Sequence, residues 1–378
     1  MPLMSESPDK QVSPQGFLPR EEFQSLVDGL RRAGYRCMGP RIKEGAITYG
    51  PLHSVDELPR GVNDEQSPGV YRLKHGAAQR YFAWANGPQA LKPLLFAPRE
   101  SLWRVQRDDD GHIHFRETLP AVTTVAVIGV RACDLAALRI QDRIFLQDSH
   151  ADPYYAARRE GLFLVAVNCS HPAASCFCVS TGDGPSATHS YDITLDELDE
   201  GFVVASGSPA GVAVLDGLAL APVSDAQRHA VEAQYRHAVQ AQTRTLPGRN
   251  LRDVLFSNLE HPRWQETAER CLSCGNCTMV CPTCFCHAEH EQPLLDGTSS
   301  EHVREWDSCF TQGHSYIHGL TIRPDTRTRY RQWLTHKLGS WHDQFDSSGC
   351  VGCGRCISWC PVGIDITEEA HAICGDGQ

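Results

Sequence analysis

The sequence lacks any long hydrophobic run. Its longest apolar stretch, about residues 121–130, falls well short of the roughly 20 residues that a membrane-spanning helix needs. Residues 1–17 are polar and contain neither an apolar signal core nor a twin-arginine motif. We therefore expect no transmembrane segment and a cytoplasmic location.

Positive charge is also scarce. The 378 residues include 35 Lys and Arg against 46 Asp and Glu, which gives a formal net charge of −11. A protein whose task is to neutralise the phosphates of DNA or RNA needs the opposite sign. Nucleic acid is therefore not an expected partner.

Signatures of nucleotide binding and of nucleophilic catalysis are missing as well. No G-x-G-x-x-G lies between a strand and a helix and no P-loop sequence is present, so the chain lacks the usual devices for dinucleotides or ATP. No Ser/His/Asp or Cys/His arrangement stands out as a nucleophile system. We therefore assign no catalytic residue.

Cysteine, by contrast, is abundant, with 17 in the chain. In a reducing compartment clustered thiols indicate metal ligands or catalytic groups rather than disulfides. The 41% of hydrophobic residues is enough for sizeable cores. Because one domain usually takes roughly 100–200 residues, the length predicts two or more domains in a globular protein.

The first predicted domain, residues 1–246, is mixed α/β. Residues 122–130 and 162–167 are almost wholly apolar, as strands covered on both faces should be, and residues 134–145 between them have helical spacing. This pattern predicts a parallel strand-helix-strand unit with a right-handed crossover. Residues 24–30 can form a further short helix.

A domain boundary is predicted at the break Leu246-Pro247-Gly248, after a helix that Ser224 caps and that runs to about Ala241. The second predicted domain, residues 247–378, is expected to be an all-α, two-cluster ferredoxin-like domain. Its predicted helices are residues 252–259, 263–270 and 327–345.

Two cysteine runs in the second domain share one spacing. They are Cys271-x2-Cys274-x2-Cys277-x3-Cys281-Pro282 and Cys350-x2-Cys353-x2-Cys356-x3-Cys360-Pro361. In two-cluster ferredoxins the fourth cysteine of such a run ligates the other cluster. We therefore assign one 4Fe-4S cluster to Cys271, Cys274, Cys277 and Cys360, and a second to Cys350, Cys353, Cys356 and Cys281. Structural zinc is the alternative, but zinc sites usually offer two Cys pairs with a longer spacer.

A less regular set of cysteines lies in the first domain. Cys133 follows the first predicted buried strand and Cys169 follows the second, so both belong at the edge of the sheet where α/β proteins bind ligands. Cys176 and Cys178 need only fold back to complete four thiolates. A third iron-sulfur cluster is the first interpretation, and zinc or inert buried thiols remain alternatives.

The other cysteines carry weaker signals. Cys284, Cys286 and Cys309 lie near the first run. Cys284 and Cys286 could be an alternative ligand pair, but packing of small hydrophobic side chains beside a cluster is the favoured interpretation. Cys37 and Cys374 look incidental.

A basic stretch comprises Arg323, Arg327, Arg329, Arg331 and Lys337. We interpret it as a solvated helix face, with a docking surface for an acidic partner as the alternative.

Several segments outside the two runs are distinctive. They are Gly129–Asp134, Asn168–Cys169, Cys176–Cys178, Trp306–Cys309, Tyr330–Lys337 and Cys360–Thr367. Over about residues 122–367 the chain resembles the iron-sulfur β subunits of cytoplasmic NiFe sulfhydrogenases and the similar A subunit of anaerobic sulfite reductase. Ala132 stands where relatives often carry proline, which leaves the cysteine pattern intact.

The resemblance implies a subunit without substrate chemistry of its own. Such subunits lie beside a flavin-containing subunit that exchanges electrons with NAD(P)H, and they relay electrons between it and a hydrogenase or a sirohaem reductase. The resemblance also favours a third 4Fe-4S cluster, because the four cysteines of the first domain belong to matching motifs. Our first hypothesis is therefore an electron-transfer subunit of a hetero-oligomeric, NAD(P)-linked NiFe hydrogenase.

Three alternatives stay open. One is the same role in an anaerobic sulfite or sulfur reductase, which the sequence does not separate from a hydrogenase. Another is a self-contained flavin- or iron-sulfur-dependent reductase, against which the missing glycine signatures argue. The last is a redox-sensing interaction protein, although the scarcity of basic residues argues against DNA regulation.

Overall fold

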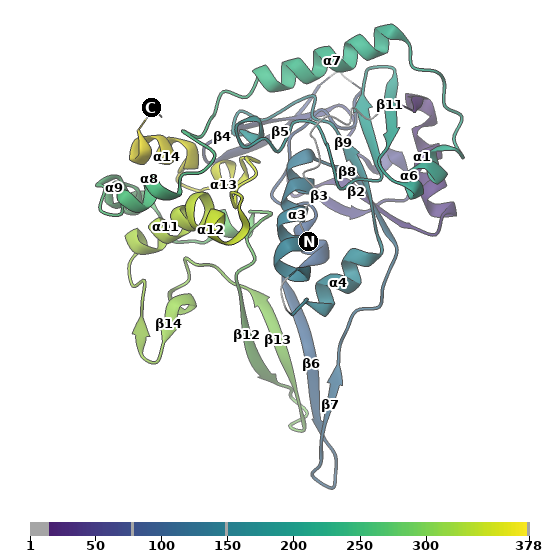
Figure 1. Ribbon diagram of the computed structural model, residues 1–378. Coiled ribbons are helices and arrows are strands. Elements are labelled where there is room, and N and C mark those ends of the chain that lie inside the picture. The colour runs from purple at the N-terminus through teal and green to yellow at the C-terminus, as the bar shows by residue number, and fades with distance from the viewer. Residues whose placement is uncertain (1–14, 77–78, 148–149, 376–378) are drawn as a thin grey trace, which may run out of the picture.

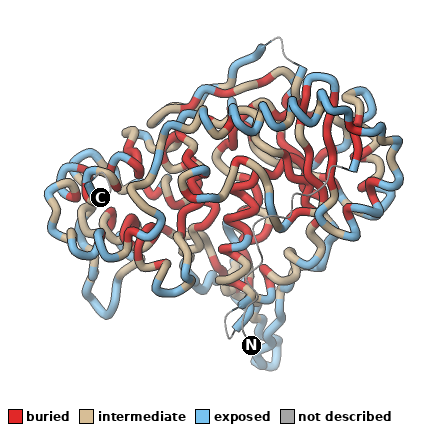
Figure 2. Tube along the Cα trace, turned by 45° about the horizontal axis from the view of Figure 1, so that its top comes forward, coloured by how far each residue is buried: buried red, intermediate tan, exposed pale blue. Residues whose placement is uncertain are grey.

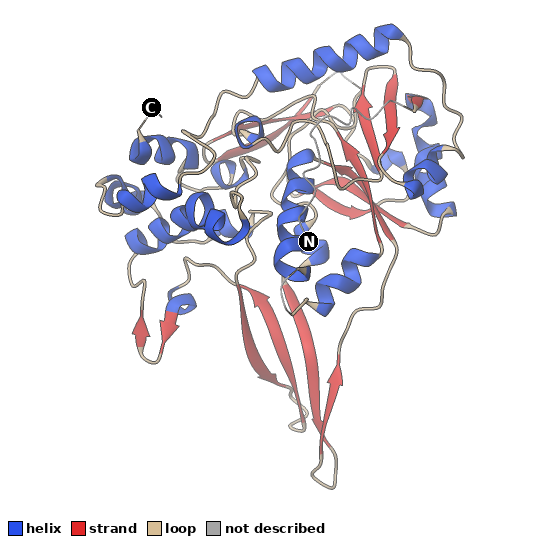
Figure 3. Ribbon diagram, in the orientation of Figure 1, coloured by secondary structure: helices blue, strands red, loops and turns tan. Residues whose placement is uncertain are grey.

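A seven-stranded sheet forms the centre of the amino-terminal part in the computed structural model, which describes residues 15–76, 79–147 and 150–375 (Figures 1 and 3). In sheet order the strands are β1 (Gly16–Pro19), β11 (Gly201–Ser206), β10 (Ile193–Glu197), β9 (Leu162–Val167), β8 (Val125–Val130), β2 (Arg36–Lys43) and β3 (Ala46–Pro51). The four central strands β10, β9, β8 and β2 run parallel to one another, and the outer strands pair antiparallel.

A strand-helix-strand unit lies at the middle of this sheet. Strand β8 leads into α3 (Ala132–Leu146), α4 (Pro153–Glu160) follows, and β9 returns parallel to β8. The sequence predicted this unit, although the first strand begins at Val125 rather than at residue 122. The carboxyl ends of β8 and β9 therefore lie side by side.

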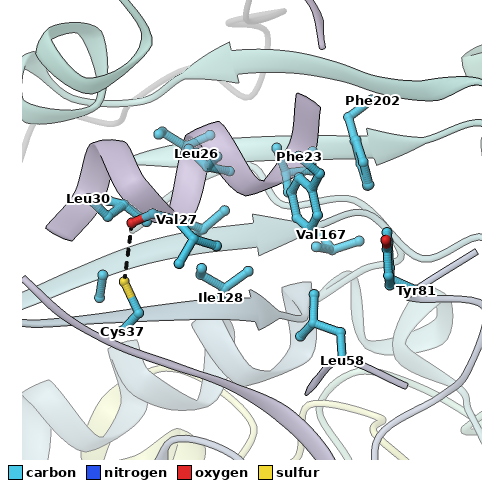
Figure 4. Close-up of a cluster of buried hydrophobic side chains, with 14 of the residues drawn as sticks. Phe23, Leu26, Val27, Leu30, Cys37, Leu58, Tyr81, Ile128, Val167 and Phe202 are labelled. Carbon is cyan, nitrogen blue, oxygen red and sulfur yellow. Dashed lines mark hydrogen bonds between the residues drawn. The ribbon is translucent and has the colours of Figure 1, made fainter. Parts of the chain in front are cut away.

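Both faces of the sheet are covered. On one face α1 (Phe23–Arg32) packs against strand side chains such as Ile128 and Val167 (Figure 4). Helix α6 (Pro209–Leu215) contributes to the same core. On the other face α3 and α4 cover Val127, Leu164 and their neighbours. Strands β8 and β9 in the centre of the sheet are buried along most of their length, which explains their unbroken apolar sequences, and buried chain runs through the middle of this part (Figure 2).

Further elements complete this part. They are the 3-10 turns η1 (Arg20–Glu22) and η2 (Val55–Glu57), the hairpin β4 (Val62–Ser67) and β5 (Val70–His75), α2 (Lys92–Leu95), α5 (Cys178–Thr181) and α7 (Asp225–Gln240). Ser224 caps α7 as the sequence predicts, in a capping box with Gln227.

The carboxyl-terminal part packs several short helices around one apolar core. They are α8 (Arg252–Ser257), α9 (Arg263–Arg270), α10 (Asn276–Met279), α11 (Thr326–Thr335), the π-helical turn η4 (His336–Ser340), α12 (Trp341–Phe345), α13 (Arg355–Ser358) and α14 (Ile366–Cys374). The single helix predicted over residues 327–345 is thus α11, η4 and α12 in succession. Within the described ranges, every helix is too short or too polar to cross a membrane.

The all-α prediction for residues 247–378 is wrong. Strands β12 (His287–Pro293) and β13 (Ser299–Trp306) form a hairpin, and β13 pairs with β6 (Arg99–Arg107), which pairs with β7 (Ile113–Glu117) (Figure 1). A small hairpin of β14 (Tyr316–Ile317) and β15 (Leu320–Thr321) follows the 3-10 turn η3 (Gln312–Ser315). The four-stranded sheet joins the two predicted domains, because β6 and β7 come from residues 1–246.

Candidate metal centres

The first group of thiols combines one cysteine run with the end of the other. Helix α9 ends just before Cys271, and α10 begins after Gly275, which adopts the left-handed conformation that the tight loop needs. Cys360 lines the same cavity as Cys271, Cys274 and Cys277. Burial and the neighbouring thiolates, Cys360 included, raise the pKa of Cys277 well above its usual value.

The surroundings of this first group suit a sulfur-rich occupant. The backbone N–H of Ser273 donates to Cys271 Sγ at 3.4 Å, and that of Ile364 donates to Cys360 Sγ at 3.3 Å. Tyr330 and Trp333 line the cavity, and their buried O–H and Nε1–H groups have no hydrogen-bond partner among the described residues. Unpaired buried donors are costly, so an acceptor is expected there. The sulfides and thiolates of a 4Fe-4S cluster supply such acceptors.

The second group of thiols combines the second cysteine run with the last cysteine of the first run. Burial raises the pKa of Cys350 to about 12, and the charges of Cys353 and Cys281 add to the shift. Burial also raises the pKa of Cys356 well above its usual value, with the same neighbours contributing. Cys281, the last cysteine of the first run, therefore lies with the second run. Cys277 of its own run is also a neighbour, so the ligation of the second cluster by Cys281 stays a prediction.

A buried lysine touches this second group. Lys337 Nζ lies 3.3 Å from Cys281 Sγ and donates to Thr283 Oγ1 at 3.0 Å and to the Gly349 carbonyl at 3.2 Å. Its side chain is only 5% exposed. The interpretation of the basic stretch as a solvated helix face is therefore wrong for Lys337 and for Arg329, which is also buried and donates to backbone carbonyls.

The third group gathers at the sheet edge, as predicted. Cys133 lies in the first turn of α3, just after β8, and Cys169 follows β9. Cys176 lies in the loop that leads into α5, and Cys178 begins α5. Burial raises the pKa of Cys176 well above its usual value, and Cys178 and Cys169 contribute. Burial, Asp134 and then the thiols of Cys353 and Cys178 raise the pKa of Cys133. The structure therefore brings the predicted residues together and places them beside the second group.

All three groups are wider than a site for a single ion. Among the residues that the structure describes, no three Cys, His, Asp or Glu side chains converge closely enough to hold one metal ion. A zinc site draws four ligand atoms to about 2.0–2.3 Å from one centre. Four thiolates spread around a larger inorganic core are what an iron-sulfur cluster requires. The donor chemistry and the spacing favour clusters over zinc.

Two glycines of the second cysteine run let the second thiol group pack closely against the third. The carbonyl of Gly352 accepts a hydrogen bond from Phe177 N at 2.8 Å. Both Gly352 and Gly354 have positive φ, and a Cβ on either would collide with the backbone of the Ser175–Cys178 loop. These glycines therefore permit the close approach of the two thiol groups.

A buried ion pair strengthens the same junction. Arg355 Nη2 lies 2.8 Å from Asp134 Oδ1, and both side chains are about 1% exposed. Arg355 Nε donates to the Gly87 carbonyl at 3.0 Å, and Asp134 accepts from Asn86 Nδ2 at 2.9 Å. Arg355 belongs to the second cysteine run and Asp134 follows Cys133, so the pair connects the two groups directly. The sequence offered no signal for this pairing, because the residues are distant in the chain.

Replacing Gly354 with alanine is expected to destabilise the chain more than Gly45→Ala. Both glycines have positive φ, but a Cβ at position 45 meets nothing within 4 Å. Gly45→Ala therefore costs only the backbone strain, about 1–2 kcal/mol. Gly354→Ala adds an overpacking penalty of about 1–3 kcal/mol against Ser175. Thermal midpoints of the anaerobically purified variants measure the difference, and equal midpoints would contradict the close packing.

Comparisons with known proteins agree with these arrangements. Two family models, each described as a 4Fe-4S dicluster domain, match residues 270–364 and 227–285. The chain is 31% identical to Sulfhydrogenase 2 subunit beta of Pyrococcus furiosus over 355 residues, which cover 92% of this chain and 95% of that protein. No solved structure matches the chain significantly. The chain belongs to the iron-sulfur family of sulfhydrogenase beta subunits.

Proposed function

We propose that this chain is an electron-transfer subunit of a hydrogenase-type complex and relays single electrons through three 4Fe-4S clusters. The observation that carries the proposal is the contiguity of the three thiol groups. Cys281 of the first run lies near Cys356 of the second, and the second and third groups meet at Gly352, Gly354 and the Arg355–Asp134 pair. When bound, such clusters store and pass one electron at a time. The chain supplies their spacing, burial and charge environment.

The proposed ligands follow the three groups. One cluster is held by Cys271, Cys274, Cys277 and Cys360, the next by Cys350, Cys353, Cys356 and Cys281, and the third by Cys133, Cys169, Cys176 and Cys178. Asn86 Nδ2 lies 3.4 Å from Cys133 Sγ, and Cys178 Sγ lies 3.5 Å from Gln242 Oε1. The Asn86 amide N–H is positioned to tune the third site, as outer hydrogen bonds do in other metal centres.

The relative suggests the partners. It is named a sulfhydrogenase subunit, so we propose that this chain assembles in the cytoplasm with a NiFe hydrogenase and with a flavin-containing subunit that reacts with NAD(P)H. Co-expression with candidate subunits tests this assignment. A stable complex that reduces NAD(P)⁺ with H₂ supports it, whereas assembly with a sirohaem protein would identify a sulfite reductase instead.

Iron content tests the third site. Replacing Cys169 and Cys176 together with alanine is expected to remove about four iron atoms per chain, because two of four thiolates are lost. Cys37→Ala is the matched control, since Cys37 is buried in the sheet core, where its thiol donates to the Val27 carbonyl. Iron and acid-labile sulfide are measured on anaerobically purified protein, with the electron paramagnetic resonance (EPR) signals of the other clusters as a check on folding. Unchanged iron in the double variant would contradict the third cluster.

A further inference from the structure

Three cysteines outside the proposed ligand sets lie close together. Cys284 and Cys286 precede β12, and Cys309 follows β13. The hairpin register pairs His287 with Trp306, and Asp307 N donates to the Cys286 carbonyl at 2.9 Å. The β12–β13 hairpin therefore brings segments that are more than twenty residues apart to one place.

These cysteines share one cavity with a histidine. Cys284, Cys286, Cys309 and His314 all line a cavity of about 360 Å³. Cys286 lies within hydrogen-bonding reach of both Cys309 and His314. His314 is held from its other side, because its Nδ1 lies 3.0 Å from Asp307 Oδ2. At about 30 Å³ per water molecule, the cavity has room for an inorganic cluster.

Buried positive charge faces the same thiols. The Lys92 ammonium lies 3.9 Å from the centroid of the Trp306 ring, and the side chain is only 6% exposed. Its strongest charge interactions are with the thiols of Cys284 and Cys281. Lys337, also buried, lines the cavity. The thiolate ligands of a metal cluster are negatively charged, and two buried lysines beside them are positioned to offset that charge.

We propose that Cys284, Cys286 and Cys309, with His314 as the fourth ligand, hold a further iron-sulfur cluster. Three thiolates and one imidazole form a four-ligand set, and imidazole replaces thiolate on iron in Rieske centres. A single zinc ion is the alternative occupant, and the iron and acid-labile sulfide content distinguishes it from a cluster.

The Asp307 contact supports the role of His314. A metal-bound histidine commonly directs its second ring nitrogen to a carboxylate, which fixes the ring orientation. Here Asp307 contacts Nδ1, which leaves Nε2 for the cavity. His287, which also lines the cavity, instead directs its Nδ1 to the Phe285 carbonyl.

The proposed site extends the relay on the side of the second group. Cys284 lies within hydrogen-bonding reach of Cys281, which we assign to the second cluster. The inference rests on the proposed electron-transfer function, because it adds a station to the same relay. Packing beside a cluster, the interpretation favoured by the sequence, does not account for the histidine, the cavity or the buried ammonium groups.

The test is the iron and sulfide content of the full chain, purified anaerobically after co-expression with the iron-sulfur assembly machinery. The double variant Cys286→Ala/Cys309→Ala is expected to lose about four iron atoms relative to the unsubstituted chain. The matched control Cys374→Ala, a partly buried cysteine on α14, is expected to lose none. The EPR signals of the first two clusters report whether the double variant is folded.

If the double variant does not fold, variants of His314 test the proposed cluster instead. His314→Ala is expected to lower the iron content, whereas His314→Cys restores it and changes the EPR spectrum, because a thiolate replaces an imidazole on iron. Iron unchanged in the folded double variant, or in His314→Ala, would overturn the proposal. The proposed function fails separately, if the unsubstituted chain binds less than the roughly twelve iron atoms of its three proposed clusters.

Discussion

Replacing Arg355 with methionine is expected to lower the stability of the folded chain by about 3–5 kcal/mol. The substitution leaves the Asp134 carboxylate buried without its cation, at a point where both partners are about 1% exposed. At about 2 °C per kcal/mol for a large chain, the thermal midpoint should fall by roughly 6–10 °C. The second and third thiol groups meet at this pair, so cluster occupancy should fall with it.

Two further variants separate the buried charge from a general packing defect. The double variant Arg355→Met/Asp134→Leu is expected to recover most of the lost stability, because apolar groups of similar size can replace a buried ion pair. Arg252→Met is the control, since Arg252 and Asp343 form a pair of similar length that is 42% and 50% exposed. Exposed pairs contribute about 0–1 kcal/mol. If Arg355→Met lowers the midpoint no further than Arg252→Met, the ion pair does not hold the junction.

The features that the sequence predicted well are set by local rules. The duplicated cysteine spacing implies which thiols can surround one cluster, and the structure places Cys281 and Cys360 with the opposite runs. The apolar runs of β8 and β9 predict buried parallel strands, from which the position of Cys133 and Cys169 at one edge follows. Each of these predictions needed only a pattern within a short stretch of chain.

The features that were missed depend on contacts between distant segments. Residues His287–Pro293 of β12 are almost entirely exposed, so they carry no alternation of apolar and polar side chains that would predict a strand. The strand forms because β13 pairs with both β12 and β6. Burial of Lys337 was missed for a similar reason, since its partners Thr283 and Gly349 come from other segments. The cavity of Cys286, Cys309 and His314 depends on the same hairpin.

Lys337 places a positive charge beside the second group of thiols. Burial alone would lower the pKa of Lys337, but the thiolates of Cys281, Cys284 and Cys350 raise it well above its usual range. The side chain is therefore an ammonium at neutral pH. A cluster gains negative charge when it is reduced, and a nearby cation stabilises the reduced form.

Replacing Lys337 with glutamine or methionine is therefore expected to make the reduction potential of the second cluster more negative. At an effective dielectric constant of about 20, a unit charge interacts with an added electron over ~4–8 Å by about 2–4 kcal/mol. For a one-electron couple this corresponds to a shift of roughly 90–180 mV. Glutamine keeps a donor for Cys281 and methionine does not, so any excess shift in Lys337→Met measures the hydrogen bond.

EPR-monitored redox titration of the anaerobically purified chain measures this shift. Lys337→Arg, which keeps the charge, and Arg252→Gln, which removes an exposed one, are the controls and are expected to leave the potential close to that of the unsubstituted chain. A shift of less than about 30 mV in both Lys337→Gln and Lys337→Met would mean that solvent or other charges screen the ammonium. The potential of the second cluster would then be set by its thiolates and backbone N–H groups rather than by Lys337.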